Sequence, residues 1–201
     1  MNRAYRKFEL LMSDTKNISS IYDYLQKCVK GPLNYDDLLR LQWVQSVSAL
    51  DKLVHDLVRV GMVHIFTGRR SSTVKYRNFQ VDMNWYELVA STPYIIIPEF
   101  EKKVIKQHGY LAFEDPDKIS DALSNIWDAN DKWKLIADRM YEDKNTVRIT
   151  LKNIVTRRNQ IAHEGDYIDD FGNRQVIEKI DTDVVLNFID KVGTAIYECV
   201  R

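Results

Sequence analysis

Four side chains able to take part in chemistry lie close together near the end of a predicted helix, within residues 156–166. Arg157 and Arg158 are followed directly by Asn159, and His163 comes five residues after Arg158. An arginine stays protonated and can bind phosphate, whereas a histidine titrates near neutral pH and can accept or donate a proton. Metal-free cleavage of RNA needs these groups, because the 2′-hydroxyl must lose a proton, the 5′-oxygen must gain one, and the charged phosphorane must be stabilised.

The helix that carries these residues is predicted over residues 144–163, and it has one apolar face. The apolar residues on this face are Val147, Leu151, Ile154, Val155, Ile161 and Ala162. Arg158 lies at the centre of the same face, whereas His163 is rotated from it by roughly 140° at about 100° per residue. Gly165 is typical of the position just beyond a helix end. We therefore expect Arg158 to face packed helices and His163 to lie off the apolar stripe.

A second long helix, predicted over residues 35–66, carries a charge in a similar position. Asp51 falls in the middle of its apolar stripe, which comprises Val44, Val47, Val54 and Val58. A carboxylate on an apolar face is either half buried and solvated, or it meets a cation from another helix, because an unpaired buried charge is costly. The opposite charges of Asp51 and Arg158 predict that the two helices pack together, with the pair within salt-bridge or single-water reach. A structural ion pair alone would not require Arg157, Asn159 or His163.

Residues 67–80 combine four basic side chains with two aromatic ones. The basic residues are Arg69, Arg70, Lys75 and Arg77, and the aromatic residues are Tyr76 and Phe79. Such a segment could grip a nucleic-acid backbone and stack bases. It could equally be a solvated connection whose long side chains lie over the core. The segment is expected to be a loop or a short β-hairpin, and the sequence does not decide between them.

Helical periodicity and the positions of Gly and Pro predict an all-α bundle of about six to eight helices. The predicted helices cover residues 3–29, 35–66, 82–91, 95–108, 116–127, 131–141, 144–163 and 182–200. We expect one domain over residues 1–201, with an N-terminal helical segment over 1–30 and a core over 35–200. The helices over 35–66, 144–163 and 182–200 are expected at its centre.

The composition and charge limit the kind of RNA site, the redox compartment and the membrane association that we expect. The 201 residues contain 29 Lys and Arg and 29 Asp and Glu, so the net charge is zero and any RNA site must be a local patch. The two cysteines, Cys28 and Cys199, are interpreted as buried thiols of a reduced, cytoplasmic protein. No signal peptide is visible, and no apolar run approaches the ~20 residues that span a bilayer, so no membrane partner is expected.

No metal or other cofactor is expected. His55, His64 and His108 lack the spacing of metal ligands, and the chain has no Cys-x-x-Cys motif. The acidic run over residues 166–170 is interpreted as a solvated loop in preference to a calcium site.

Two segments together resemble a known family. Arg158 and Asn159, three intervening residues and then His163 match the short motif of the HEPN superfamily. The longer run over residues 157–166 is similar to the RiboL-PSP type of HEPN domain in particular. The run Ser-Ala-Leu-Asp-Lys-Leu-Val-His-Asp over residues 48–56 resembles the first long core helix of that group. The resemblance covers residues 18–200, although the basic segment and residues 94–115 are less characteristic.

This resemblance implies a fold and residue roles. HEPN domains are helical bundles that usually pair, so that two Arg/His motifs face each other across a cleft. Arg158 and His163 would be catalytic, Asn159 would orient them, Asp51 would support the motif, and Arg157 would add a cation for phosphate. Many members are metal-independent endoribonucleases of toxin–antitoxin or anti-phage systems, whereas others only bind a nucleotide or a partner protein.

Three functional hypotheses follow. The first is a homodimeric endoribonuclease that cleaves single-stranded RNA, as a toxin or defence effector with an antitoxin or inhibitor protein as partner. The second is a non-catalytic HEPN module that binds nucleotide, RNA or a partner protein. The third is an unrelated helical interaction protein in which the motif is coincidental.

Overall fold

The computed structural model describes residues 1–31 and 33–201, which form an all-α bundle. Within these residues there is no β-strand, and one isolated antiparallel bridge joins Tyr167 to Arg174. The helices are α1 (Asn2–Cys28), α2 (Asp36–Phe66), α3 (Val74–Arg77), α4 (Met83–Ser91), the 3₁₀-helix η1 (Pro93–Ile95), α5 (Ile96–His108), α6 (Pro116–Leu123), α7 (Lys132–Met140), α8 (Lys144–Glu164) and α9 (Lys179–Val200). The fold class predicted from periodicity is confirmed.

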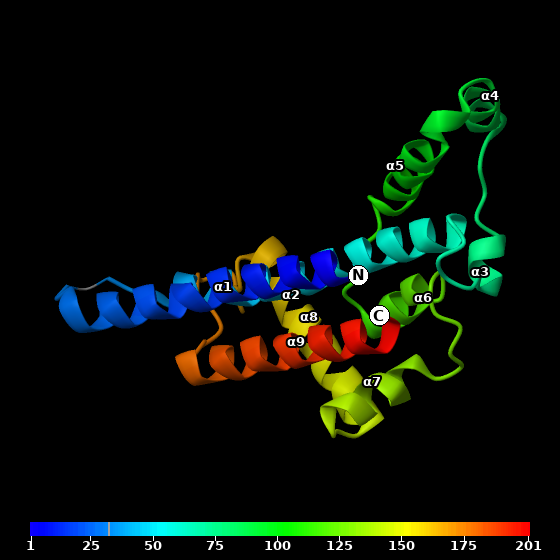
Figure 1. Cartoon of the computed structure of the whole chain (residues 1–201). Coiled ribbons are helices and arrows are strands. Elements are labelled where there is room, and N and C mark those ends of the chain that lie inside the picture. Colours follow the sequence, from blue (N-terminus) through cyan, green and yellow to red (C-terminus); the bar gives the residue numbers. More distant parts are fainter. Residues whose placement is uncertain (32) are drawn as a thin grey trace.

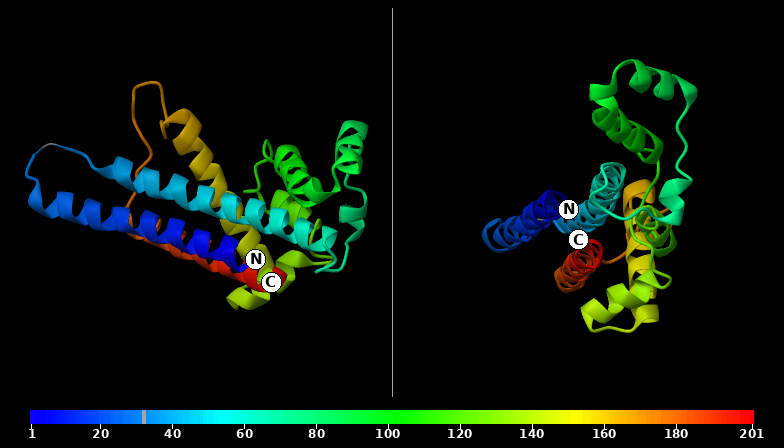
Figure 2. Two further views of the ribbon diagram at one scale, coloured as in Figure 1. Left: turned by 45° about the horizontal axis from the view of Figure 1, so that its top comes forward. Right: turned by 45° about the vertical axis from the view of Figure 1, so that its right-hand side comes forward.

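Helix α2 is the element on which most others pack. It contacts α1, α5, α6, α8 and α9. Figure 1 shows α1, α2 and α9 lying lengthwise beside one another, and the views in Figure 2 show α8 crossing them steeply. Helices α4 and α5 project from the bundle, and α4 is held mainly by η1 and α5. The helices predicted over 35–66, 144–163 and 182–200 thus appear as α2, α8 and α9, with α8 and α9 both packed on α2.

The apolar stripes of these helices meet in one hydrophobic cluster. Its largest fully buried side chains are Phe8, Met12, Leu50, Leu53, Leu57, Met62, Ile119, Leu123, Ile126, Ile136 and Leu151. Burial of each such side chain contributes roughly 1.5 to 3 kcal/mol. None of the described helices is both long enough and apolar enough to cross a bilayer.

The basic segment over residues 67–80 contains a short helix, α3, and no hairpin. Thr73 begins this helix, because its Oγ1 accepts the N–H of Tyr76 at 3.0 Å and donates to the carbonyl oxygen of Asn125 at 3.1 Å. This extra turn brings the described α-helices to nine, where six to eight were predicted. The cysteine prediction was wrong for Cys28, which is exposed at the end of α1.

Helix α8 has clear local signals at both ends. Asp143 accepts the N–H groups of Asn145 and Thr146, each at 2.9 Å, and thereby satisfies two donors that the first turn leaves free. At the other end Gly165 adopts φ 63°, the left-handed conformation that closes a helix at little cost when no Cβ is present. The length of α8 is therefore set by its own sequence.

Gly193 lets α9 and α1 approach closely, and its substitution tests this packing. A Cβ at Gly193 would clash with the buried ring of Phe8. We expect Gly193→Ala to lower the free energy of unfolding by about 1 to 2 kcal/mol, because overpacking outweighs the ~1 kcal/mol that Ala gains in a helix. Urea unfolding measures this difference.

Gly31→Ala is the matched control, since a Cβ at Gly31 meets no atom within 4 Å. Its free energy of unfolding should change by less than about 0.5 kcal/mol. Equal unfolding midpoints for the two variants would contradict the close approach of α1 and α9.

Candidate active site

Arg158 lies on the inner side of α8 and pairs with a residue that the sequence did not single out. Its guanidinium forms an ion pair with the carboxylate of Glu114, in the segment between α5 and α6. The two side chains are only 12% and 14% exposed, so solvent screens this pair weakly. Arg158 Nε is also buried and has no hydrogen-bond partner among the described residues. Burial lowers the pKa of Arg158.

Asp51 does not form the predicted salt bridge with Arg158. No contact within 4.0 Å joins their charged groups, although both residues are described. Instead, Asp51 Oδ1 accepts the backbone N–H of Phe113 at 2.5 Å. The negative charge of Asp51 still acts to raise the pKa of Arg158, against the larger effect of burial, so the two lie within electrostatic reach. The segment over residues 111–114 thus provides a partner for each of the two side chains.

His55 is bound to the same segment. Its Nε2 lies 3.0 Å from the carbonyl oxygen of Leu111, which can only accept, so Nε2 carries the proton. The His55 ring packs on Phe113 with centroids 4.3 Å apart, and Nε2 lies 3.7 Å from Asp51 Oδ1. A hollow of about 340 Å³ beside Asp51 also includes His108, whose pKa is lowered mainly by burial. Two imidazoles that lack ligand spacing in sequence therefore flank Asp51.

Asn159 and His163 lie on the solvent side of α8. They are four residues apart, which places them on the same face of the helix, and both side chains are exposed. In the described chain neither side chain makes a hydrogen bond. The His163 imidazole is therefore open to solvent in the last turn of α8, next to the helix end.

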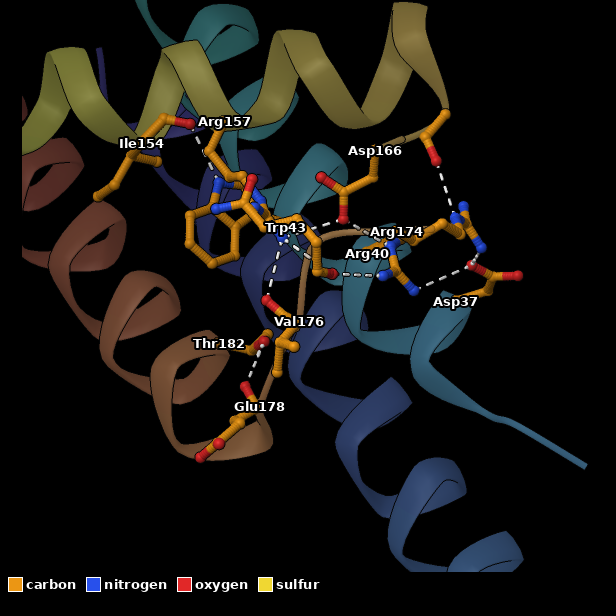
Figure 3. A network of polar contacts seen from close by, with 12 residues as sticks. Asp37, Arg40, Trp43, Ile154, Arg157, Asp166, Arg174, Val176, Glu178 and Thr182 are labelled. Carbon is orange, nitrogen blue, oxygen red and sulfur yellow. Dashed lines mark hydrogen bonds and ion pairs between the residues drawn. The ribbon is translucent and has the colours of Figure 1, made fainter. Parts of the chain in front are cut away.

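Arg157, which the family resemblance would use as an added cation for phosphate, is paired with a buried carboxylate. Figure 3 shows its guanidinium beside Asp166, whose side chain is 0% exposed. Asp166 Oδ2 accepts from Arg157 Nη2 at 2.9 Å and from Arg40 Nε at 2.8 Å. Arg157 also donates to the carbonyl oxygen of Val176 at 3.2 Å. The interpretation of residues 166–170 as wholly solvated was wrong at Asp166, because two arginines neutralise its charge.

The same network extends to the start of α2. Arg174 donates to the carbonyl oxygen of Gly165 at 2.8 Å and pairs with Asp37 at 2.5 Å. On the other side, Trp43 Nε1 donates to the carbonyl oxygen of Ile154 at 3.0 Å and ties α2 to α8 (Figure 3). These contacts fasten the loop after α8 to α2, and so fix the helix end that carries the motif.

The basic residues expected to contact RNA are engaged locally. Arg70 donates to the carbonyl oxygens of Ile126 and Val200, at 2.8 and 2.6 Å. Lys75 pairs with Asp121. Both side chains therefore hold the α6 region or the end of α9 in place.

Arg69 and Arg77 are more exposed. Arg69 Nε donates to Thr67 Oγ1 at 2.9 Å, and Arg77 Nε donates to Ser72 Oγ at 3.1 Å. Neither contacts the residues around Arg158. The structure thus gathers Arg158, Glu114 and Asp51 around one segment, and leaves the basic segment outside that group.

Sequence reasoning missed two residues for different reasons. Arg40 carried a signal, since it lies one heptad before Val47 on the same stripe that singled out Asp51. Glu114 carried none, because it lies in a connection without periodicity and its position depends on how α5 and α6 pack. Among the described residues no group of three or more His, Cys, Asp and Glu is placed to hold a metal ion.

The helical bundle carries an Arg–polar pair ahead of an exposed His at the end of α8, as the resemblance to HEPN domains implies. The RiboL-PSP-HEPN family model matches residues 10–198, and the chain therefore belongs to this family. Family membership points to a nuclease or a nucleotide-binding module. No curated protein matches the chain, and no solved structure matches it either.

The buried network makes a prediction about stability. Asp166→Ala would leave Arg157 without a carboxylate partner and Arg40 with only the exposed Asp37, so the free energy of unfolding should fall by about 3 kcal/mol. Asp170→Ala, an exposed neighbour in the same loop, should change it by less than about 0.5 kcal/mol. Urea unfolding of both variants checks this. If Asp166→Ala unfolds at the same midpoint as Asp170→Ala, the network does not hold the loop.

Proposed function

We propose that this protein is a metal-independent endoribonuclease that cleaves single-stranded RNA through attack of the RNA's own 2′-hydroxyl. The observation that carries the proposal is the arrangement at the end of α8. His163 is exposed and unbonded among the described residues, Asn159 lies on the same helix face, and Arg158, held by Glu114, directly precedes Asn159 and lies on the inner side of the helix. Family membership supports a nuclease, and the residue types supply the groups that this reaction needs.

Each group has a role in the reaction. A His163 imidazole accepts the proton of the 2′-hydroxyl as its oxygen attacks the adjacent phosphorus, and the bond to the 5′-oxygen breaks. A second imidazole protonates the leaving 5′-oxygen. Arg158 stabilises the charge that develops on the phosphorane, and Asn159 orients the reacting groups. The products are a 2′,3′-cyclic phosphate end and a free 5′-hydroxyl end.

This scheme requires two imidazoles, whereas each chain provides one His163. We therefore propose a homodimer that brings the segments over residues 158–163 of both chains to a shared cleft. An activity of this kind would suit a toxin or anti-phage effector, kept inactive by an antitoxin or another inhibitor protein that covers the cleft. The resemblance to the family supports this role.

A non-catalytic binding module is the second candidate, and one observation favours it. Arg158 is mostly buried and already paired with Glu114, so its charge is partly compensated before any phosphate arrives. A module that only binds nucleotide, RNA or a partner protein would not need that charge in the cleft.

The first prediction on function concerns cleavage. The purified protein should cut single-stranded RNA in EDTA and leave 2′,3′-cyclic phosphate or 3′-phosphate ends, whereas DNA should resist because it lacks the 2′-hydroxyl. His163→Ala should reduce the cleavage rate by roughly 10²-fold or more. Lys152→Ala, an exposed change on the same helix, should cleave at the parent rate. Gel analysis of labelled RNA measures all three proteins.

The role of Arg158 needs a control for stability. Arg158→Met alone would strand Glu114, so it is combined with Glu114→Leu, a pair of apolar residues that restores packing. The double variant should melt near the parent temperature and lose roughly 10²-fold or more in rate. If His163→Ala melts like the parent and still cleaves at the parent rate, the binding module replaces the nuclease as the proposed function.

The second prediction on function concerns assembly. Light scattering should give the mass of two chains at micromolar concentration. Asn159→Arg, which adds an exposed charge at the proposed contact, should shift the mass toward one chain, whereas Lys134→Glu on α7 should not. A single-chain mass for the parent protein, alone and with RNA, would contradict a shared cleft.

A further inference from the structure

A second hollow lies at the far end of α2, and the proposed reaction does not use it. We call it the end hollow. Its volume is about 650 Å³, and it is lined by Met1, Asn2, His64, Arg69, Arg70, Ser71, Ser72, Thr73, Ile126, Trp127, Asp128 and Arg201. It thus forms where the chain leaves α2, beside the turn that follows α6.

The end hollow is rich in positive charge that no carboxylate neutralises. In the part of the chain that the structure describes, Arg69 and Arg70 have no carboxylate within 4.0 Å. Arg69 is exposed, and the hydrogen bond from its Nε to Thr67 leaves both terminal nitrogens of the guanidinium free. Within residues 1–31 and 33–201, the side chain of Arg70 donates only to backbone carbonyl oxygens, which orient its guanidinium without cancelling its charge. Asp128 is the one acidic side chain of the lining, and it is exposed.

The backbone adds donors at the same place. Among the described residues, the N–H groups of Arg70, Ser71 and Ser72 donate no hydrogen bond within the protein. Ser71 also presents a free hydroxyl, whereas Ser72 Oγ accepts from Arg77. Successive backbone N–H groups beside guanidinium groups and hydroxyls form the kind of donor set that binds phosphate oxygens.

Two further residues of the lining, His64 and Trp127, would lie next to such a ligand. The pKa of His64 is lowered, first by partial burial and then by the positive charges of Arg69, the N-terminal amine and Arg70, so His64 lies close to these cations. Trp127 lines the hollow and is partly exposed, so it offers an aromatic face next to the cations. An aromatic face beside a phosphate site suits the base of a nucleotide.

We propose that the end hollow is a phosphate-binding site, which takes the phosphate of a nucleotide or of a nucleic-acid strand against Arg69, Arg70 and the N–H groups of residues 70–72. It is separate from the site at Asp51 and Arg158, since the axis of α2 from Asp51 to Phe66 alone spans about 22 Å. The proposal concerns binding only and does not depend on RNA cleavage.

Amide NMR spectra of the full chain test this site. The probes are inorganic phosphate, adenosine monophosphate and a short single-stranded oligodeoxynucleotide, which carries phosphates but cannot be cleaved through a 2′-hydroxyl. We expect shift changes concentrated at the amides of residues 70–72 and at the indole of Trp127. The pKa of His64 should rise on binding, because a bound anion favours its protonated form. Binding of phosphate or the mononucleotide would identify a small ligand, and binding of the oligonucleotide alone would identify a strand.

Two charge-reversal variants distinguish binding at the end hollow from nonspecific attraction of an anion to any cationic side chain. Arg69→Glu should weaken binding about tenfold or more, since it replaces a phosphate partner by a repelling carboxylate. Lys27→Glu makes the same charge change on an exposed residue at the other end of α1 and should leave the affinity unchanged. Arg70 is left intact, because its contacts to Ile126 and Val200 support the fold.

The proposal is overturned if none of the three probes shifts the amides of residues 70–72. It is equally overturned if Arg69→Glu binds as tightly as Lys27→Glu. Both outcomes leave the cleavage assay unaffected, so a failure here is distinguishable from a failure of the proposed nuclease activity.

Discussion

The buried carboxylate of Asp166 is the constraint on which the end of α8 depends. Its side chain has no exposed surface, so its charge must be compensated inside the protein. Arg40 from α2 and Arg157 from α8 provide this compensation from two directions, on one oxygen. Asp166 itself adopts φ 65°, which is unusual for a residue with a Cβ and is held here by the contacts of its side chain and backbone. The helix end with His163 is fixed as a consequence.

The segment over residues 111–114 plays the corresponding role on the inner side of α8. Its backbone binds His55 and Asp51, and its Glu114 side chain binds Arg158. A connection between two helices thus completes the electrostatic surroundings of residues that belong to α2 and α8. Arg158 is therefore held in place by Glu114, which belongs to neither α2 nor α8.

The net charge is zero, but the arginines with and without carboxylate partners lie in different parts of the protein. The arginines at positions 40, 157 and 158 have carboxylate partners and little exposure, and they hold helices together. Around the end hollow, Arg69 and Arg70 face solvent or backbone carbonyl groups and keep their charge available. Arginines therefore support packing near the start of α2, whereas Arg69 near its end has no carboxylate partner among the described residues.

The sequence by itself determined the helices and the accessible half of the site. The apolar periodicity of α8 and Gly165 at its end are local features, so the helix was predicted within a residue of its true ends. The same periodicity placed His163 off the apolar stripe. It also indicated that α2 and α8 pack together, since a charge in each stripe needed compensation. Within the loop or hairpin predicted over residues 67–80, residues 74–77 form a short helix, and Thr73 at its start also donates to the carbonyl oxygen of Asn125 from a distant turn.

Only the tertiary structure decided which charges meet. Asp51 and Arg158 were expected to pair, but ion pairing depends on distances of a few ångströms, and helical periodicity gives only the direction of a side chain. Glu114 was brought next to Arg158 by the path of the chain between α5 and α6, which no local pattern encodes. In the same way, the run over residues 166–170 gave no sign that Asp166 is buried, because its burial depends on Arg40 from α2, which only the fold places beside it.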